Sequence, residues 1–249
     1  IGLAGAALPV EHFFTIDAAT FLASAVALLL LRRALPYQVP AVPPHWREAL
    51  TGGLRLVRRH ALARYAILSS AVCNGTWYLG FILGMALLVQ ERWPGDLQAY
   101  GFVIAAYGCG NLAANLVVAS VPIRRPAVRL LASRLFYGLG VAALALPLPL
   151  PATCAIAAVA AIGGPLGDMT ILHILQTDFP PGDLARLYRL RMAAVQGATL
   201  LALLAAPWLY GAIGVAAAVC LSGLAAAAAG LGAVRFIVNR GQLCIHSKA

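Results

Sequence analysis

Polar side chains recur at helical spacing inside the apolar segments of this sequence, and they are its best candidates for chemistry. A polar side chain inside a lipid bilayer is costly, so it usually faces protein or water. Residues four apart share one face of a helix, so each series predicts a polar stripe. The stripes are Ser70, Asn74 and Tyr78 with Trp77 beside them, then Tyr107, Asn111 and Asn115, and finally Asp168 and Gln176 with His173 nearby. Together they predict a polar cavity, and hydrogen bonds that merely hold helices together are the alternative.

Asp168 is the strongest single candidate. It directly follows a stretch that contains Gly163, Gly164, Pro165 and Gly167, which allows close helix approach or a bend. Counted from the inner end of its apolar run, it lies roughly 13 Å deep at 1.5 Å per residue. The sequence places no arginine or lysine at comparable depth. We therefore predict a desolvated carboxyl group that can exchange a proton, with a structural role as the alternative.

Motifs of enzymes and cofactor sites are absent from the sequence. It has no phosphate-binding loop, zinc-protease HExxH, nucleophile elbow, kinase signature or dinucleotide-binding glycine pattern. The five cysteines form no CxxC pair and show no metal-ligand spacing with histidine. We therefore expect no enzyme, no cofactor and no metal site.

The elements that would position these residues are membrane spans. The chain has 249 residues, of which 62% are hydrophobic and 10% charged, whereas soluble domains are about half apolar and a quarter charged. One span needs about 20 apolar residues. We predict seven spans, in runs 14–31, 65–89, 99–121, 130–147 and 152–177 and in two halves of 191–235 around a turn at 211–214. Arg134 lies one turn into its run, where its stem could reach the interface.

The net charge of +10 does not indicate a nucleic-acid partner, because that would need one basic stripe on a soluble face. The basic residues fall in four bunches between apolar runs, and seven alternating spans put all of them except Arg92 on one side. Basic loops mark the cytoplasmic side. We therefore predict a multi-pass protein of the cell inner membrane with a cytoplasmic C-terminus.

The longest inner loop has two parts. Residues 34–44 contain four prolines and indicate a linker. Residues 46–59 place Trp46, Leu50, Leu54 and Val57 at helical spacing among arginines, which predicts a basic amphipathic helix on the inner membrane surface. A connector between two helix bundles is the favoured interpretation, and a regulatory lipid sensor is the alternative.

Four segments carry a family resemblance. They are FFTIDAATFLASAVALLLLR, WREALTGGLRLVRRHALAR, YGFVIAAYGCGNLAANL and GGPLGDMTILHILQTDFPPGDLARLYRLR. Together they resemble the drug and siderophore exporter branch of the major facilitator superfamily. The resemblance implies an all-α polytopic membrane protein of twelve helices in two six-helix bundles, with a substrate site between the bundles near the midplane.

On that resemblance the chain is a C-terminal fragment. Residues 1–33 would end the N-terminal bundle, with 1–8 closing its fifth helix. Residues 34–64 would be the central cytoplasmic loop, 65–238 the C-terminal six-helix bundle and 239–249 a cytoplasmic tail. The missing N-terminal helices, the lipid bilayer and a small-molecule substrate would be its partners.

The resemblance also implies a function, which is secondary active transport, with proton-coupled efflux of small amphipathic molecules. Asp168 would couple the proton. Seven further residues would line the substrate cavity: Asn74, Trp77, Tyr78, Tyr107, Asn111, Asn115 and Gln176. The alternative is a seven-helix receptor-like or structural membrane protein without transport activity.

Overall fold

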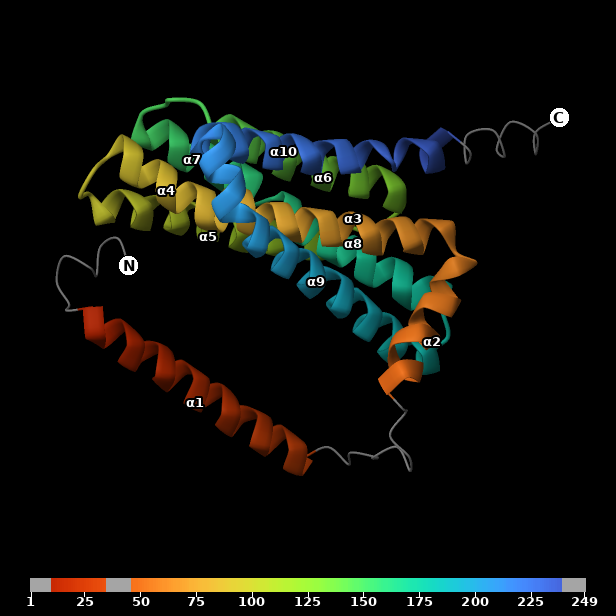
Figure 1. Ribbon diagram of the computed structural model, residues 1–249. Coiled ribbons are helices and arrows are strands. Elements are labelled where there is room, and N and C mark those ends of the chain that lie inside the picture. The colour runs from red at the N-terminus through yellow and green to blue at the C-terminus, as the bar shows by residue number, and fades with distance from the viewer. Residues whose placement is uncertain (1–9, 35–45, 239–249) are drawn as a thin grey trace.

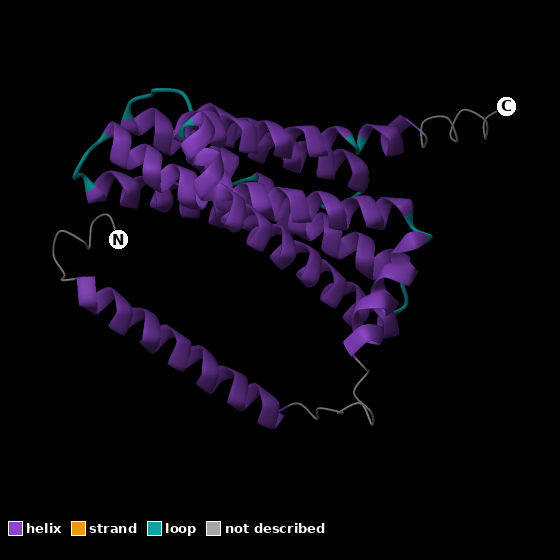
Figure 2. Ribbon diagram, viewed as in Figure 1, coloured by secondary structure: helices purple, strands orange, loops and turns teal. Residues whose placement is uncertain are grey.

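The described part of the chain, residues 10–34 and 46–238 of a computed structural model, is helical and contains no strand (Figures 1 and 2). Seven helical stretches are long and apolar enough to cross a membrane. This confirms the prediction of an all-α chain with seven candidate spans. The elements are α1 (Val10–Ala34), α2 (Trp46–Arg58), α3 (Ala61–Trp77), the π-helix η2 (Tyr78–Leu83), α4 (Gly84–Arg92), α5 (Leu97–Ser120), α6 (Pro126–Leu144), α7 (Leu150–Ala160), α8 (Gly163–Asp178), α9 (Pro181–Ile213) and α10 (Val215–Leu231).

The helix α1 lies apart from the other helices (Figure 1). None of its membrane-length window, within Phe14–Arg33, is buried, so its apolar side chains are available to lipid or to further helices. Three predictions fall outside the described residues. They are the helix end at 1–8, most of the proline linker at 34–44 and the tail at 239–249.

The bundle from α3 to α10 is held together by close helix contacts through small residues. A Cβ atom on Gly138 of α6 would lie 2.4 Å from the backbone nitrogen of Ala227 in α10, and one on Gly223 would lie 2.3 Å from that of Ala142. Helices in membranes associate through such packing because lipid removes the hydrophobic drive between them. The contact fixes α6 against α10 and thereby sets the position of the α6 residues that face inward.

Two of the candidate spans are interrupted. The second carries a π-helical turn between α3 and α4, and the fifth breaks at Ala161 and Ile162, just before the predicted glycine stretch. Gly163 and Gly167 lie inside α8, where they allow close contact with α6. Between the last two spans, Gly214 separates α9 from α10 and has a φ of +82°. Glycine adopts this left-handed conformation at little cost.

The predicted amphipathic helix exists as α2, and it packs on the bundle. Val57 is 2% exposed, whereas Leu54 is 54% exposed, so the apolar residues of this helix do not all face the bundle. The reason is a backbone contact, because a Cβ atom on Gly53 would lie 2.7 Å from the carbonyl oxygen of Arg186 in α9. This approach turns Gly53 and Val57 toward the bundle and leaves Leu54 outside. The side chains of Trp46 and Leu50 are not among those described.

Candidate functional site

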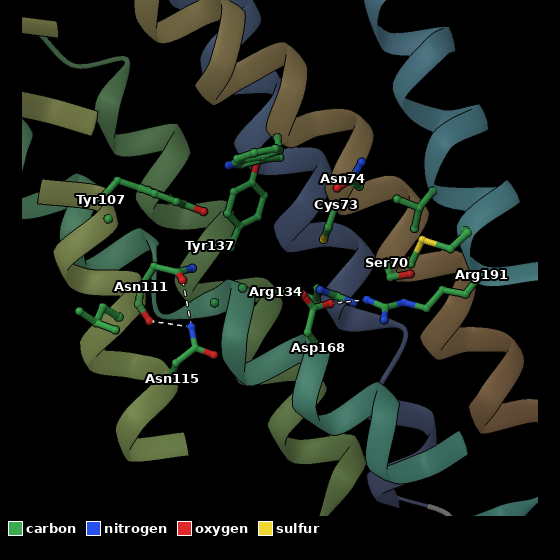
Figure 3. A pocket seen from close by; sticks show the side chains of 17 residues that line it. Ser70, Cys73, Asn74, Tyr107, Asn111, Asn115, Arg134, Tyr137, Asp168 and Arg191 are labelled. Atoms are coloured by element: carbon green, nitrogen blue, oxygen red, sulfur yellow. Dashed lines mark hydrogen bonds and ion pairs between the residues drawn. The ribbon is translucent and has the colours of Figure 1, made fainter. Parts of the chain in front are cut away.

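A cavity of about 640 Å³ opens in the bundle between α3, α5, α6, α8 and α9 (Figure 3). Its volume lies within the range of small-molecule sites in proteins. The wall is mixed, with charged, amide, hydroxyl and aromatic groups. Its polar and aromatic residues are Ser70, Asn74, Trp77, Tyr107, Asn111, Asn115, Arg134, Tyr137, Asp168 and Arg191.

The charged residues of the cavity lie deep along their helices. Asp168 lies before Asp178, the last residue of α8, and Arg191 lies after Pro181, the first residue of α9. The two separations along the sequence are equal. At 1.5 Å per residue both lie about 15 Å from the helix ends that meet at the α8–α9 connection. The cavity is therefore near the middle of a membrane-length bundle rather than at either end.

Five of the seven residues expected in a cavity line this one: Asn74, Trp77, Tyr107, Asn111 and Asn115. Tyr78 and Gln176 do not line it, and Gln176 is exposed. Each step of four residues turns a helix by 400°, which is 40° beyond a full turn. After two steps the third member of a series points about 80° away from the first. Asn115 stays on the cavity wall despite this drift, whereas Tyr78 begins the π-helix η2 and Gln176 lies near the end of α8, about 12 Å along the axis from Asp168.

Hydrogen bonds hold part of this wall in place. The Asn74 side-chain amide donates to the Thr199 hydroxyl at 2.6 Å, which links α3 to α9. Within α5, the Asn115 amide donates to the backbone and side-chain oxygens of Asn111, both at 3.0 Å. Hydrogen bonds that hold helices together were the alternative to a polar cavity. Asn74 makes such a bond and also lines the cavity.

Asp168 forms an ion pair with Arg191 across the α8–α9 interface. Its side chain is 65% exposed, whereas that of Arg191 is 13% exposed. The expectation that Asp168 is desolvated and has no arginine at its depth was therefore wrong. The physical reason is the length of α9, which begins at Pro181 and carries Arg191 well into the bundle instead of at its edge.

Arg134 is the other arginine of the site, and it does not reach the interface as the sequence indicated. It is 5% exposed. Its guanidinium donates to the hydroxyls of Ser133 at 3.4 Å and Ser69 at 3.3 Å. Gly167 of α8 leaves room for it, because a Cβ atom there would lie 2.9 Å from one guanidinium nitrogen. The side chain is thus enclosed by α3, α6 and α8.

Both arginines were missed as cavity residues because each predicted span was taken to begin or end close to a charged residue. Proline at the first position of a helix is a start signal that the sequence does carry. Pro126 and Pro181 occupy the first positions of α6 and α9. Counting from these prolines puts Arg134 and Arg191 more than two helical turns inside their spans.

No group of three or more metal-ligating side chains comes together in the described ranges. Comparisons with protein-family models, with curated proteins and with solved structures each found no match for the chain.

Proposed function

We propose that this chain forms part of a secondary transporter that exports small amphipathic molecules in exchange for protons. The supporting observation is the cavity at mid-depth of the bundle, whose wall combines Asp168, Arg134 and Arg191 with amide and aromatic side chains. Charged groups are rare at such depth and usually mark a path for a substrate or an ion. This arrangement favours transport over a purely structural role, which would leave these charges unused.

The proposed transporter needs more helices than the chain contributes. The helices α5 and α9, on two sides of the cavity, are among the least buried, with 17% and 11% of their membrane-length windows enclosed. Leu116 of α5 is 67% exposed and Leu204 of α9 is 70% exposed. We propose that a second bundle of the same protein covers these surfaces, as in the two-bundle architecture of the major facilitator superfamily. The helix α1 would be the last helix of that bundle.

Transport in this scheme would occur by rocking of the two bundles around the cavity. The ion pair between Asp168 and Arg191 joins α8 to α9. A proton on Asp168 would remove the negative charge and weaken its attraction for Arg191. The arginine would then be free to interact elsewhere, which gives a route from proton binding to helix movement.

The membrane orientation is part of the proposal. In Figure 1 the connections that follow α5 and α8 lie at the same end of the bundle as α2. Arg124 and Arg125 lie in the first of these connections, and Arg55 and Arg58 lie in the last turn of α2. Because basic residues favour the cytoplasmic side, we propose that this end faces the cytoplasm of a cell whose inner membrane holds the protein.

A proton-flux assay tests the function. The longest open reading frame that contains this sequence would be reconstituted in liposomes filled with a pH-sensitive dye. Three matched dinitrophenyl probes would then be added under a pH gradient: dinitrophenyl-glycine, its amide, and dinitrophenyl-ethylenediamine. We expect at least one probe to accelerate proton movement.

The variant Asp168→Asn should lose this acceleration. Asp178→Asn, at the exposed end of the same helix, should keep it and serves as the matched control. If no probe moves protons although it binds the protein, a receptor-like or structural role would replace transport.

A further inference from the structure

The cavity carries an unbalanced positive charge. Arg134, Arg191 and Asp168 are the charged residues that line it in the described part of the chain, so two guanidinium groups face one carboxylate. The carboxylate pairs with Arg191. In the described residues no carboxylate forms an ion pair with Arg134, although that side chain is 5% exposed. A buried charge without a partner is unfavourable, so an anion in the cavity would be stabilised.

The Arg134 guanidinium also has more hydrogen-bond donors than it has acceptors nearby. Its two hydrogen bonds are long, at 3.3 and 3.4 Å, and both go to neutral serine hydroxyls. The Nε atoms of Arg134 and Arg191 are buried and have no hydrogen-bond partner. A guanidinium offers five donors in a planar fork that fits a carboxylate through two parallel bonds. What this wall lacks is an acceptor with negative charge.

Aromatic rings form the neighbouring part of the wall. Figure 3 shows Tyr107 and Tyr137 to one side in that view and Arg191 to the other, with Arg134 between them. Trp77 also lines the cavity. Rings of this kind present large apolar faces on which another planar ring can stack. The wall therefore combines a guanidinium group that can bind an anion with aromatic side chains on which another ring can stack.

We infer that this cavity binds an organic anion, in which an acidic group such as a carboxylate is attached to an aromatic ring. The acidic group lies at Arg134 and the ring lies against Trp77, Tyr107 and Tyr137. This inference rests on the proposed transport function, because it names the substrate class of the same cavity. Small neutral or cationic amphipathic molecules of the same size are the competing classes.

The binding test uses the 249-residue chain in lipid nanodiscs. The substitutions Trp46→Phe, Trp93→Phe and Trp208→Phe leave Trp77 as the sole tryptophan and thus as the reporter inside the cavity. The three dinitrophenyl probes quench tryptophan emission and differ in the charge of one end group. We expect the carboxylate probe to bind about tenfold tighter than its amide, because only the carboxylate brings a negative charge and two acceptor oxygens to the Arg134 guanidinium. The cationic probe should bind most weakly.

Variants assign this preference to Arg134. Arg134→Gln should reduce the affinity for the carboxylate about tenfold and that for the amide much less, because only the carboxylate loses an ion pair. The matched control is Arg129→Gln on the same helix, whose guanidinium donates to the carbonyl oxygens of Val121 and Val118 outside the cavity. It should keep the full preference. Should Arg134→Gln fail to fold, Asp168→Asn decides, because removing the one acid should tighten binding of the carboxylate.

The results separate this inference from the proposed function. Equal binding of carboxylate and amide, or tightest binding of the cation, overturns the anion site even if the proton-flux assay shows transport. A carboxylate preference that Arg134→Gln leaves intact overturns the assignment to Arg134. A preference that is lost in Arg134→Gln, together with no proton flux from any probe, supports the anion site and refutes the transporter.

Discussion

Replacing Gly138 by alanine tests the helix contact that holds the cavity wall. The added Cβ atom would lie 2.4 Å from the backbone nitrogen of Ala227 and 2.6 Å from the carbonyl oxygen of Gly223. Ordinary contacts begin near 3.4 Å, and backbone atoms of a packed helix cannot rotate away. The helices α6 and α10 must therefore separate by about 1 Å, and overpacking of this kind costs about 1–3 kcal/mol.

The matched control is Gly197→Ala in α9. Nothing lies within 4 Å of its added Cβ atom, so the alanine gains roughly 0.5–1 kcal/mol from its better helix propensity. The free energies of unfolding of the two variants should differ by about 1.5–4 kcal/mol, the sum of the two effects. Titration of the chain in mixed micelles with sodium dodecyl sulfate, followed by tryptophan fluorescence, measures this difference.

A Gly138→Ala variant as stable as Gly197→Ala would refute the close α6–α10 contact. Because Gly138 directly follows Tyr137 in α6, displacement of this helix should also disturb the cavity. The carboxylate probe should bind more weakly to Gly138→Ala than to the parent chain, while Gly197→Ala should bind it normally.

Three further predictions concern charge, orientation and the position of α2. Asp168→Asn should lower the free energy of unfolding by about 1 kcal/mol or less, since its carboxylate is 65% exposed and exposed pairs contribute little; a loss above about 3 kcal/mol in the same titration would indicate a buried pair. In a cysteine-free background of the full open reading frame, Gln98→Cys should react with an impermeant thiol reagent on intact cells and Arg124→Cys should not, and the reverse pattern would invert the proposed orientation. Gly53→Val should release α2, because its Cβ atom would lie 2.7 Å from a carbonyl oxygen of α9, and trypsin should then cleave α2 about tenfold faster, equivalent to about 1.4 kcal/mol. Gly52→Val, with nothing nearer than 3.5 Å, should show no such acceleration.

The sequence alone was enough to predict the helical membrane-length architecture. Long apolar runs can satisfy their backbone only as helices in lipid, so their length and separation predict the spans regardless of how they pack. The turn at Gly214 was also predictable, because a glycine between two apolar runs permits the left-handed backbone that ends α9. Local chemistry of this kind depends on neighbours in the chain and not on distant segments.

Only the tertiary structure decided which side chains meet. Helical spacing placed Asn74 and Asn111 on polar stripes, and both line the cavity. The same rule failed for Tyr78, where the helix changes to a π-helix, and for Gln176, which lies near the end of α8. The partner of Asp168 lies 23 residues further along the chain, on α9, so no local pattern could identify it. Whether a charged residue lies at a membrane edge or inside a bundle depends on where its helix begins and on which helix packs against it, and those are properties of the folded chain.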